Sequence, residues 1–176
     1  MKRFAAIAAT LLLAACGFHL AGTRALPEAL KTVYIEVVNP YRVSEPPLAG
    51  SLRAILQRRG AMVIATPDGD AVTIRLSELR ETRQVLSVGL DGKALEFELI
   101  TRVRYQVLRG DQSLMAPDTM QVMRDYSFNA QEVLAKEAEE ARLREYMQNE
   151  LAEQLVLRVE TQLLAVPAAP AAAGAD

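Results

Sequence analysis

The chain has 176 residues, 51% of them hydrophobic, which is long enough for one domain with a sizeable core and short for two. Its 20 basic and 22 acidic residues give a formal net charge of −2. Phosphate contacts need an excess of Lys and Arg, so this charge argues against a nucleic-acid-binding protein.

The start of the chain has the pattern of a secretory signal that ends in a lipidation site. Two basic residues precede an apolar run over residues 4–13, and the small residues Ala14 and Ala15 stand directly before Cys16. A membrane-spanning helix needs about 20 apolar residues, roughly twice this run. The pattern therefore predicts a cleaved signal peptide over residues 1–15 and acylation of Cys16. A buried apolar helix would not explain why the only cysteine stands where the run ends.

A lipidated Cys16 would tether the chain to a membrane surface. One acyl chain binds only marginally, so the multi-chain anchor implied by the resemblance to bacterial lipoproteins would make attachment stable. Gly17 follows the cysteine where lipoproteins retained in the inner membrane typically carry Asp, and by similarity to that class we expect the periplasmic face of the outer membrane. Removing 15 of the 176 residues leaves 161, with 18 basic and 22 acidic residues and no free thiol. The mature chain must therefore fold without a disulfide.

The chain after the anchor divides into three parts. Residues 16–27 read as a short tether without regular structure. Residues 28–165 hold all the predicted helices and strands and form a single domain. Residues 166–176 are mostly Ala and Pro and have too little apolar bulk to offset the entropy of ordering, so we predict a disordered tail.

The first half of the domain begins with a strand and a helix. Thr32–Val38 is rich in β-branched and aromatic residues and predicts a strand. Three prolines make residues 39–47 a loop. Pro47 suits the first turn of a helix with apolar residues at helical spacing, and Gly60 can take the left-handed position after its last turn. Residues 62–65 fit a brief strand.

Alternating apolar and polar residues predict three strands in the centre of the chain. The first runs from Val72 through Val88, and Asp91-Gly92 turns it into a hairpin, because Gly accepts positive φ without steric cost. A loop containing Pro117 then leads to a strand over residues 120–128. The middle strand has an apolar side made of Leu95, Phe97, Leu99, Val103, Tyr105 and Val107.

The last predicted element is a long helix. Asn129 as N-cap and Glu132 at N3 have the form of a capping box, and no Pro or Gly interrupts the sequence to about residue 164. Glu140 and Arg144 would form an i,i+4 pair on an exposed face. Strands with one buried face and two amphipathic helices predict an α+β domain. The apolar stripe of the long helix is Leu143, Met147, Leu151, Leu155, Val159 and Leu163.

The reactive groups of the chain argue against an enzyme. Acylation removes the only thiol, and the only imidazole, His19, lies three residues from the lipid. One His without neighbouring carboxylates cannot assemble a metal site. Glu137, Glu139 and Glu140 stand among basic residues, which is typical of a solvated helix face. We therefore expect neither catalysis nor a bound metal or cofactor.

The order of these features resembles the LptE family of lipopolysaccharide-assembly lipoproteins. The resemblance rests on the five residues from Cys16 to Leu20 at the mature start and on residues 129–136 at the start of the long helix. It implies a four-stranded, mostly antiparallel sheet with two helices packed on one face. It also implies a protein that forms the plug of the large outer-membrane β-barrel LptD, assists the assembly of that barrel, and binds lipopolysaccharide on its way to the cell surface.

Two lysines are candidates for contacts with lipopolysaccharide. The family places a basic residue just before the Asx-Gly of the central hairpin. Here that position is Leu90, and Lys93 stands on the far side of the turn. Lys136 matches the family's basic residue at the start of the long helix, where an ammonium could meet a lipid phosphate. The alternative for Lys136 is a simple ion pair with Glu132.

A function of a different class also fits the sequence. An outer-membrane lipoprotein could scaffold another periplasmic complex without touching a glycolipid. Both functions need a rigid sheet beside a membrane. The protein partner that stays bound in mild detergent would distinguish them.

Overall fold

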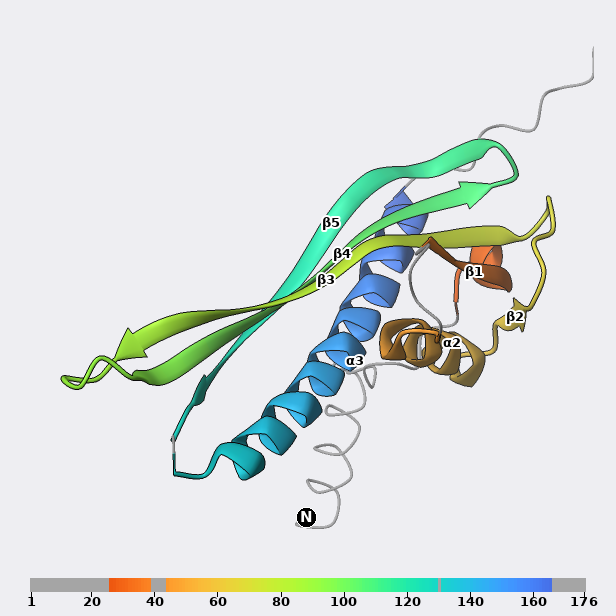
Figure 1. The fold of residues 1–176 in the computed structure, drawn as a ribbon. Coiled ribbons are helices and arrows are strands. Elements are labelled where there is room, and N and C mark those ends of the chain that lie inside the picture. The colour runs from red at the N-terminus through yellow and green to blue at the C-terminus, as the bar shows by residue number, and fades with distance from the viewer. Residues whose placement is uncertain (1–25, 39–43, 130, 166–176) are drawn as a thin grey trace, which may run out of the picture.

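The structure, a computed structural model, describes residues 26–38, 44–129 and 131–165 (Figure 1). The predicted tether, anchor and tail therefore lie wholly or mostly outside the described residues. The elements in chain order are a short 3-10 helix η1 (Glu28–Leu30), β1 (Thr32–Val38), α2 (Pro47–Arg58), β2 (Met62–Ile64), β3 (Val72–Val88), β4 (Ala94–Arg109), β5 (Gln112–Ser127) and α3 (Val133–Ala165).

The strands form one mixed sheet in the order β2-β1-β3-β4-β5. β3, β4 and β5 make an antiparallel meander, whereas β1 pairs in parallel with both β2 and β3. Parallel pairing of β1 with β2 follows from the crossover through α2, which returns the chain to the same end of the sheet. The predicted α+β class is confirmed. The sheet has five strands where four were expected, because the brief β2 joins its edge.

α2 begins and ends as the sequence predicts. Pro47 occupies the first turn, where its missing N–H costs nothing. At the other end, Gly60 has φ +92°, and its N–H donates to the carbonyl of Gln57 at 3.0 Å. The N–H of Ala61 donates to the carbonyl of Leu56 at 2.9 Å. This pair of bonds is a Schellman motif, which satisfies the last carbonyls of the helix.

Both helices cover the same face of the sheet, and the core lies between these layers (Figure 1). The predicted stripe of α3 is buried in the second half of the helix but only partly buried at Leu143 and Leu163. The first half of α3 reaches past the core. The fully buried core side chains include Val33, Leu48, Leu52, Leu56, Ile74, Val103, Tyr105, Met147, Leu151, Leu155 and Val159.

The start of α3 differs from the predicted capping box. The helix begins at Val133, and the side-chain oxygen of Asn129 accepts from the N–H of Gln131 at 3.0 Å. This bond closes a local turn ahead of the helix and is not the predicted bond to the N–H of Glu132. The Glu132 carbonyl accepts the N–H of Lys136 at 3.0 Å, so the helical bonds start there.

β5 corrects the predicted loop around Pro117. The strand starts at Gln112 and runs through this proline, because β5 is an edge strand with a bulge at this point. Tyr105 of β4 lies opposite Asp118, and Val107 lies opposite Met115. Proline has no N–H to give to a ladder, so a bulge on an edge strand is where a sheet tolerates it.

We predict that Leu155→Ala destabilises the domain far more than Leu157→Ala does. Leu155 is 0% exposed in the core and Leu157 is 64% exposed on the same helix. The two variants therefore remove the same atoms from the same helix and differ only in the burial of the side chain. The first change should lower the free energy of unfolding by about 2–5 kcal/mol, and the second by less than about 0.5 kcal/mol. Chemical denaturation followed by circular dichroism measures both. Equal losses would mean that α3 packs on a different face.

Candidate functional site

The outer part of the β3–β4 hairpin, residues 84–96, forms an arm that extends past both helices (Figure 1). The predicted turn is present: Gly92 has φ +76°, and the N–H of Gly89 donates to the carbonyl of Lys93 at 2.8 Å. The helices cover neither face of this ribbon. A two-stranded ribbon alone is only marginally stable in water.

The arm exposes an unusual amount of apolar surface. Leu95, which alternation places on the buried side of its strand, is exposed, because the sheet has left the core at this point. Register shifts after Val85 and Ser87 also break the alternation that would gather apolar side chains on one face. A dense group of exposed apolar side chains indicates a surface that another molecule covers. The exposed apolar residues of the arm are Val85, Leu86, Val88, Leu90 and Leu95.

Lys93 stands at the end of the arm with its charge largely matched by a neighbour. Its Nζ lies 3.3 Å from Oδ2 of Asp91, and its side chain is 69% exposed. Oδ1 of Asp91 also accepts the N–H of Lys93 at 3.2 Å, which fixes the turn. The ammonium is thus accessible at the tip, beside a carboxylate that makes the turn nearly neutral.

Lys136 lies in the first turn of α3, and its side chain is only 15% exposed. Its Nζ lies 2.9 Å from Glu139, so the ion partner is this residue and not the predicted Glu132. The hairpin turn and the start of α3 lie well apart in Figure 1. The structure therefore does not bring Lys93 and Lys136 into one site.

A polar network around Glu140 joins α3 to the root of the arm, by which we mean the part of the hairpin around Arg83 and Phe97, next to residues 84–96. Glu140 accepts hydrogen bonds from Arg83 of β3 at 2.8 Å and from the hydroxyl of Tyr126 of β5, and it pairs with Arg144 at 2.5 Å. The expected Glu140–Arg144 pair is present, but the Glu140 side chain is only 13% exposed and so is not a solvated face. No helical spacing could reveal the partners on the sheet, because they come from residues far along the chain.

The network continues to α2 through Gln148. The side-chain nitrogen of Gln148 donates to Glu81 of β3 at 2.8 Å, and its oxygen accepts the N–H of Leu48 at 3.0 Å. Leu48 lies in the first turn of α2, where backbone N–H groups have no partner within the helix. One buried amide side chain thus joins the sheet and both helices.

Aromatic side chains support the same region. The guanidinium of Arg83 lies 4.6 Å from the ring centre of Phe97, a cation–π contact. Phe97 stacks on Tyr126 with ring centres 5.7 Å apart and meets the edge of Phe128 at 5.3 Å. The root of the arm is therefore held rigidly, while its outer part is bare.

Charge partners control the titration of Glu140. Burial alone would raise the pKa of its carboxyl, but the hydrogen bonds from Tyr126, Arg144 and Arg83 outweigh that effect and lower the pKa from 4.5 to about 2. Burial and the bond to Glu140 raise the pKa of Tyr126. The network is therefore anionic at Glu140 at any physiological pH.

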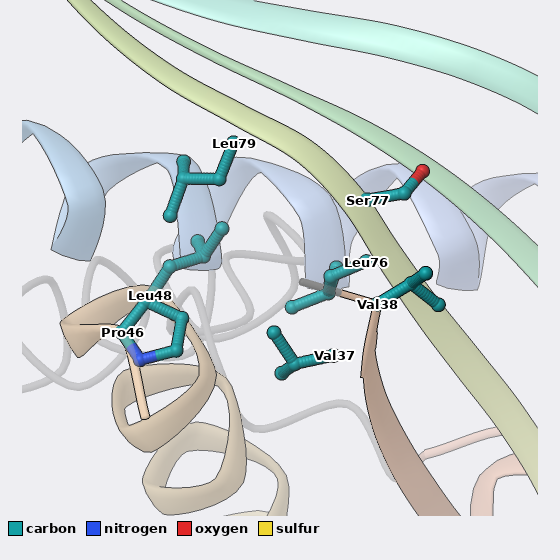
Figure 2. Close-up of a pocket in the computed structure, with 7 residues that line it drawn as sticks. All are labelled: Val37, Val38, Pro46, Leu48, Leu76, Ser77 and Leu79. Carbon is teal, nitrogen blue, oxygen red and sulfur yellow. The ribbon is translucent and has the colours of Figure 1, made fainter. Parts of the chain in front are cut away.

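An apolar hollow lies where β1, the start of α2 and β3 meet (Figure 2). Its volume is about 10 Å³, which is room for about one water molecule. A hollow of this size is a gap in packing and not a site for a lipid or a cofactor. It is lined by Val37, Val38, Pro46, Leu48, Leu76, Ser77 and Leu79.

Other kinds of site find no support in the part of the chain that the structure describes. That part holds no group of three His, Cys, Asp or Glu side chains able to bind a metal ion. None of its helices is both long and apolar enough to cross a membrane. Cys16 and His19 lie outside the described residues.

Known proteins of similar sequence are lipoproteins of lipopolysaccharide assembly. A family model described as LptE, lipopolysaccharide-assembly, matches residues 30–159. The LPS-assembly lipoprotein LptE of Photorhabdus laumondii is 36% identical over 158 residues, which cover 90% of this chain and 82% of that protein. The protein of the same name from Pectobacterium atrosepticum is 32% identical over 155 residues, which cover 87% and 81%.

Solved structures share the fold. A lipoprotein B from Nitrosomonas europaea is 25% identical with a TM-score of 0.66, and the match covers 85% of this chain and 94% of that one. The rare lipoprotein B from Shewanella oneidensis is 24% identical with a TM-score of 0.62, covering 76% and 96%. Both show that the arrangement of sheet and helices is common to these lipoproteins.

We predict that Glu140→Gln lowers the melting temperature at neutral pH and that this difference vanishes in acid. A carboxyl whose pKa is lower in the folded state binds protons less readily there than in the unfolded chain. Its stabilising effect is therefore complete above pH 4.5 and is lost as the pH falls toward about 2. Thermal melts of both proteins across this range measure the difference.

The matched control is Glu137→Gln. Glu137 is an exposed carboxylate on the same half of α3, so this change should leave the melting temperature nearly constant at every pH. A loss at Glu140 that is equally large at pH 2 and at neutral pH would show that the side chain acts through packing and not through its charge.

Proposed function

Because the chain belongs to the LptE family of lipopolysaccharide-assembly lipoproteins, we propose that it forms the plug of the LptD β-barrel, assists the assembly of that barrel, and binds lipopolysaccharide during transport to the cell surface. Membership in this family makes the chain a lipoprotein of lipopolysaccharide assembly and not an enzyme, as the sequence predicted.

The observation that carries the plug proposal is the bare apolar arm. Its side chains are exposed on a ribbon that the domain leaves uncovered on both faces, so a single flat partner surface would bury only part of them. The inside of a barrel surrounds what it encloses and can cover both faces together. The rigid root of the arm, held by the Glu140 network, would fix the direction in which the arm enters.

The proposed lipopolysaccharide contacts are Lys93 and Lys136. Each ammonium group pairs with one carboxylate in the described part of the chain, and the two lie well apart, so they would act as separate points of contact with lipid phosphates (Figure 1). The small net negative charge of the chain disfavours nonspecific adhesion to an anionic membrane. Binding would then depend on these local cations.

Acylated Cys16 would hold the domain at the periplasmic face of the outer membrane. The absence of any membrane-spanning helix from the described residues agrees with attachment through lipid. The names of the similar proteins support a lipoprotein of the cell envelope. The anchor would keep the arm near the barrel that it enters.

We predict that Val88→Asp combined with Leu90→Asp abolishes stable association with LptD without lowering the melting temperature. Both side chains are exposed in the isolated domain, so the charges cost its fold little. If the barrel enclosed the arm, the two new carboxylates would lose their hydration, which costs several kcal/mol in practice. Purification of the tagged variant from membranes in mild detergent, with detection of the barrel, measures the loss.

Leu157→Asp is the control for this experiment. Leu157 is also an exposed leucine, but it lies on α3 away from the arm, so this variant should keep the barrel. If the double variant co-purifies with as much LptD as the parent protein does, the role of the arm is disproved. A parent that brings down soluble periplasmic proteins and no barrel would favour the scaffold function instead.

We predict that Lys93→Gln combined with Lys136→Gln weakens lipopolysaccharide binding by about tenfold or more, equivalent to about 1.4 kcal/mol. The melting temperature should fall only slightly, because the Lys93 pair is exposed and glutamine keeps a hydrogen-bond donor beside Glu139. Lys31→Gln is the control for the loss of one i,i+3 lysine–glutamate pair, a kind of pair that Lys31 and Lys136 both form. Equal affinity of the double variant and the parent, measured with purified lipopolysaccharide, would exclude both lysines from the binding site.

A further inference from the structure

An open groove of about 830 Å³ runs between the end of β5 and the first half of α3. We call it the β5–α3 groove. β5 forms one edge of the sheet and α3 lies on the covered face beside it (Figure 1). The volume lies within the range of sites that bind drug-sized ligands and short peptides. The groove is lined by Asp125, Tyr126, Ser127, Ala135, Glu139, Arg142, Leu143 and Tyr146.

The edge of β5 is protected near its start and at Met123, but not beside this groove. The bulge at Pro117 interrupts it near its start. Further along, the guanidinium of Arg124 donates to the carbonyl of Met123 at 2.9 Å and pairs with Glu150 of α3 at 2.6 Å, which covers the edge. Within the described residues, neither a proline, a bulge nor a side-chain hydrogen bond covers the edge at residues 125–127.

The direction of the backbone groups at this edge follows from two bonds. The N–H of Phe128 donates to the carbonyl of Leu95 in β4 at 2.7 Å, so even-numbered residues face β4 here. The Met123 carbonyl accepts a side chain and so faces outward. Peptide groups alternate in direction along an edge strand. The N–H and C=O of Asp125 and Ser127 therefore point away from the sheet and can pair with another strand.

The side chains beside this edge indicate which residue types an added strand should have. On the face that α3 covers, Leu143 and Tyr146 offer apolar surface to its inward residues. On the opposite face, Asp125 lies directly across from Glu98, and Glu96 follows on the same strand. None of these carboxylates has a cationic partner among the described residues. Like charges opposite each other disfavour the sheet, and a cation beside them would relieve this.

We propose that the β5–α3 groove binds an extended segment of a partner protein, with alternating apolar and basic residues, that adds as a sixth strand to β5. Its backbone would bond to Asp125 and Ser127, its apolar residues would lie over α3, and a Lys or Arg would lie opposite Asp125. The proposal does not depend on the plug function, because the groove is formed by β5 and α3 and not by the exposed apolar residues of the arm.

Amide hydrogen exchange of the full chain tests the proposal. The probe is a capped heptapeptide of alternating valine and lysine, added at up to about 1 mM. At ten times its dissociation constant, exchange at Asp125 and Ser127 should slow by about tenfold, while Arg124 and Tyr126 should change little, because they already pair with β4. No slowing at these two amides over this range would overturn the proposal.

Two controls separate strand addition from other binding. A peptide of the same sequence with every backbone nitrogen methylated cannot donate backbone hydrogen bonds in either strand direction, and equal protection by this peptide would show that the groove takes any apolar chain, a lipid included. Asp125→Lys should weaken the lysine peptide by about tenfold and favour a peptide with glutamate in place of lysine. If this variant still prefers the lysine peptide to the glutamate peptide, the acidic residues do not contribute to the choice of peptide.

Discussion

The packing of the second half of α3 against one face of the sheet is the interaction on which the rest of the structure depends. Met147, Leu151 and Leu155 are fully buried there, together with side chains from every long strand. The helix has 33 residues and extends past this core, and before Met147 only Leu143 of its apolar stripe packs against it. Polar contacts centred on Glu140 join this part of the helix to the sheet, so the root of the arm is fixed by charge together with the aromatic packing around Phe97.

Much of the fold follows from local pattern. Alternating polarity predicts the strands, and the rest of the chain does not alter them. The same holds for the turns and helix ends set by a proline in the first turn of α2 and by Gly60 and Gly92. The features that pattern could not predict arise from pairing across the chain. Pro117 lies in a strand because β5 is an edge, and the brief strand expected at residues 62–65 becomes the fifth strand of the sheet because it pairs with β1.

The candidate sites were predictable to different degrees. Sequence places Lys93 at a hairpin turn and Lys136 at the start of a helix, but it does not show which carboxylate lies beside each of them. Glu140 looked like a solvated helix residue, because its spacing to Arg144 was visible and its contacts with Arg83 and Tyr126 were not. The bare apolar arm was also hidden, since alternation shows which side chains share a face but not where the helices stop covering it.

One long-range bond bears on the order in which the domain forms. The N–H of Leu48 and the side chain of Gln148 meet although they lie 100 residues apart, and β1 pairs with β3 across the whole of α2. The meander from β3 to β5 is local in sequence and can pair before α3 has been synthesised. α2 must wait for α3, the last element of the described chain, because α3 supplies the side chain that bonds Leu48. Until then the apolar face of α2 is exposed, which makes this helix the part of the domain most in need of a chaperone during folding.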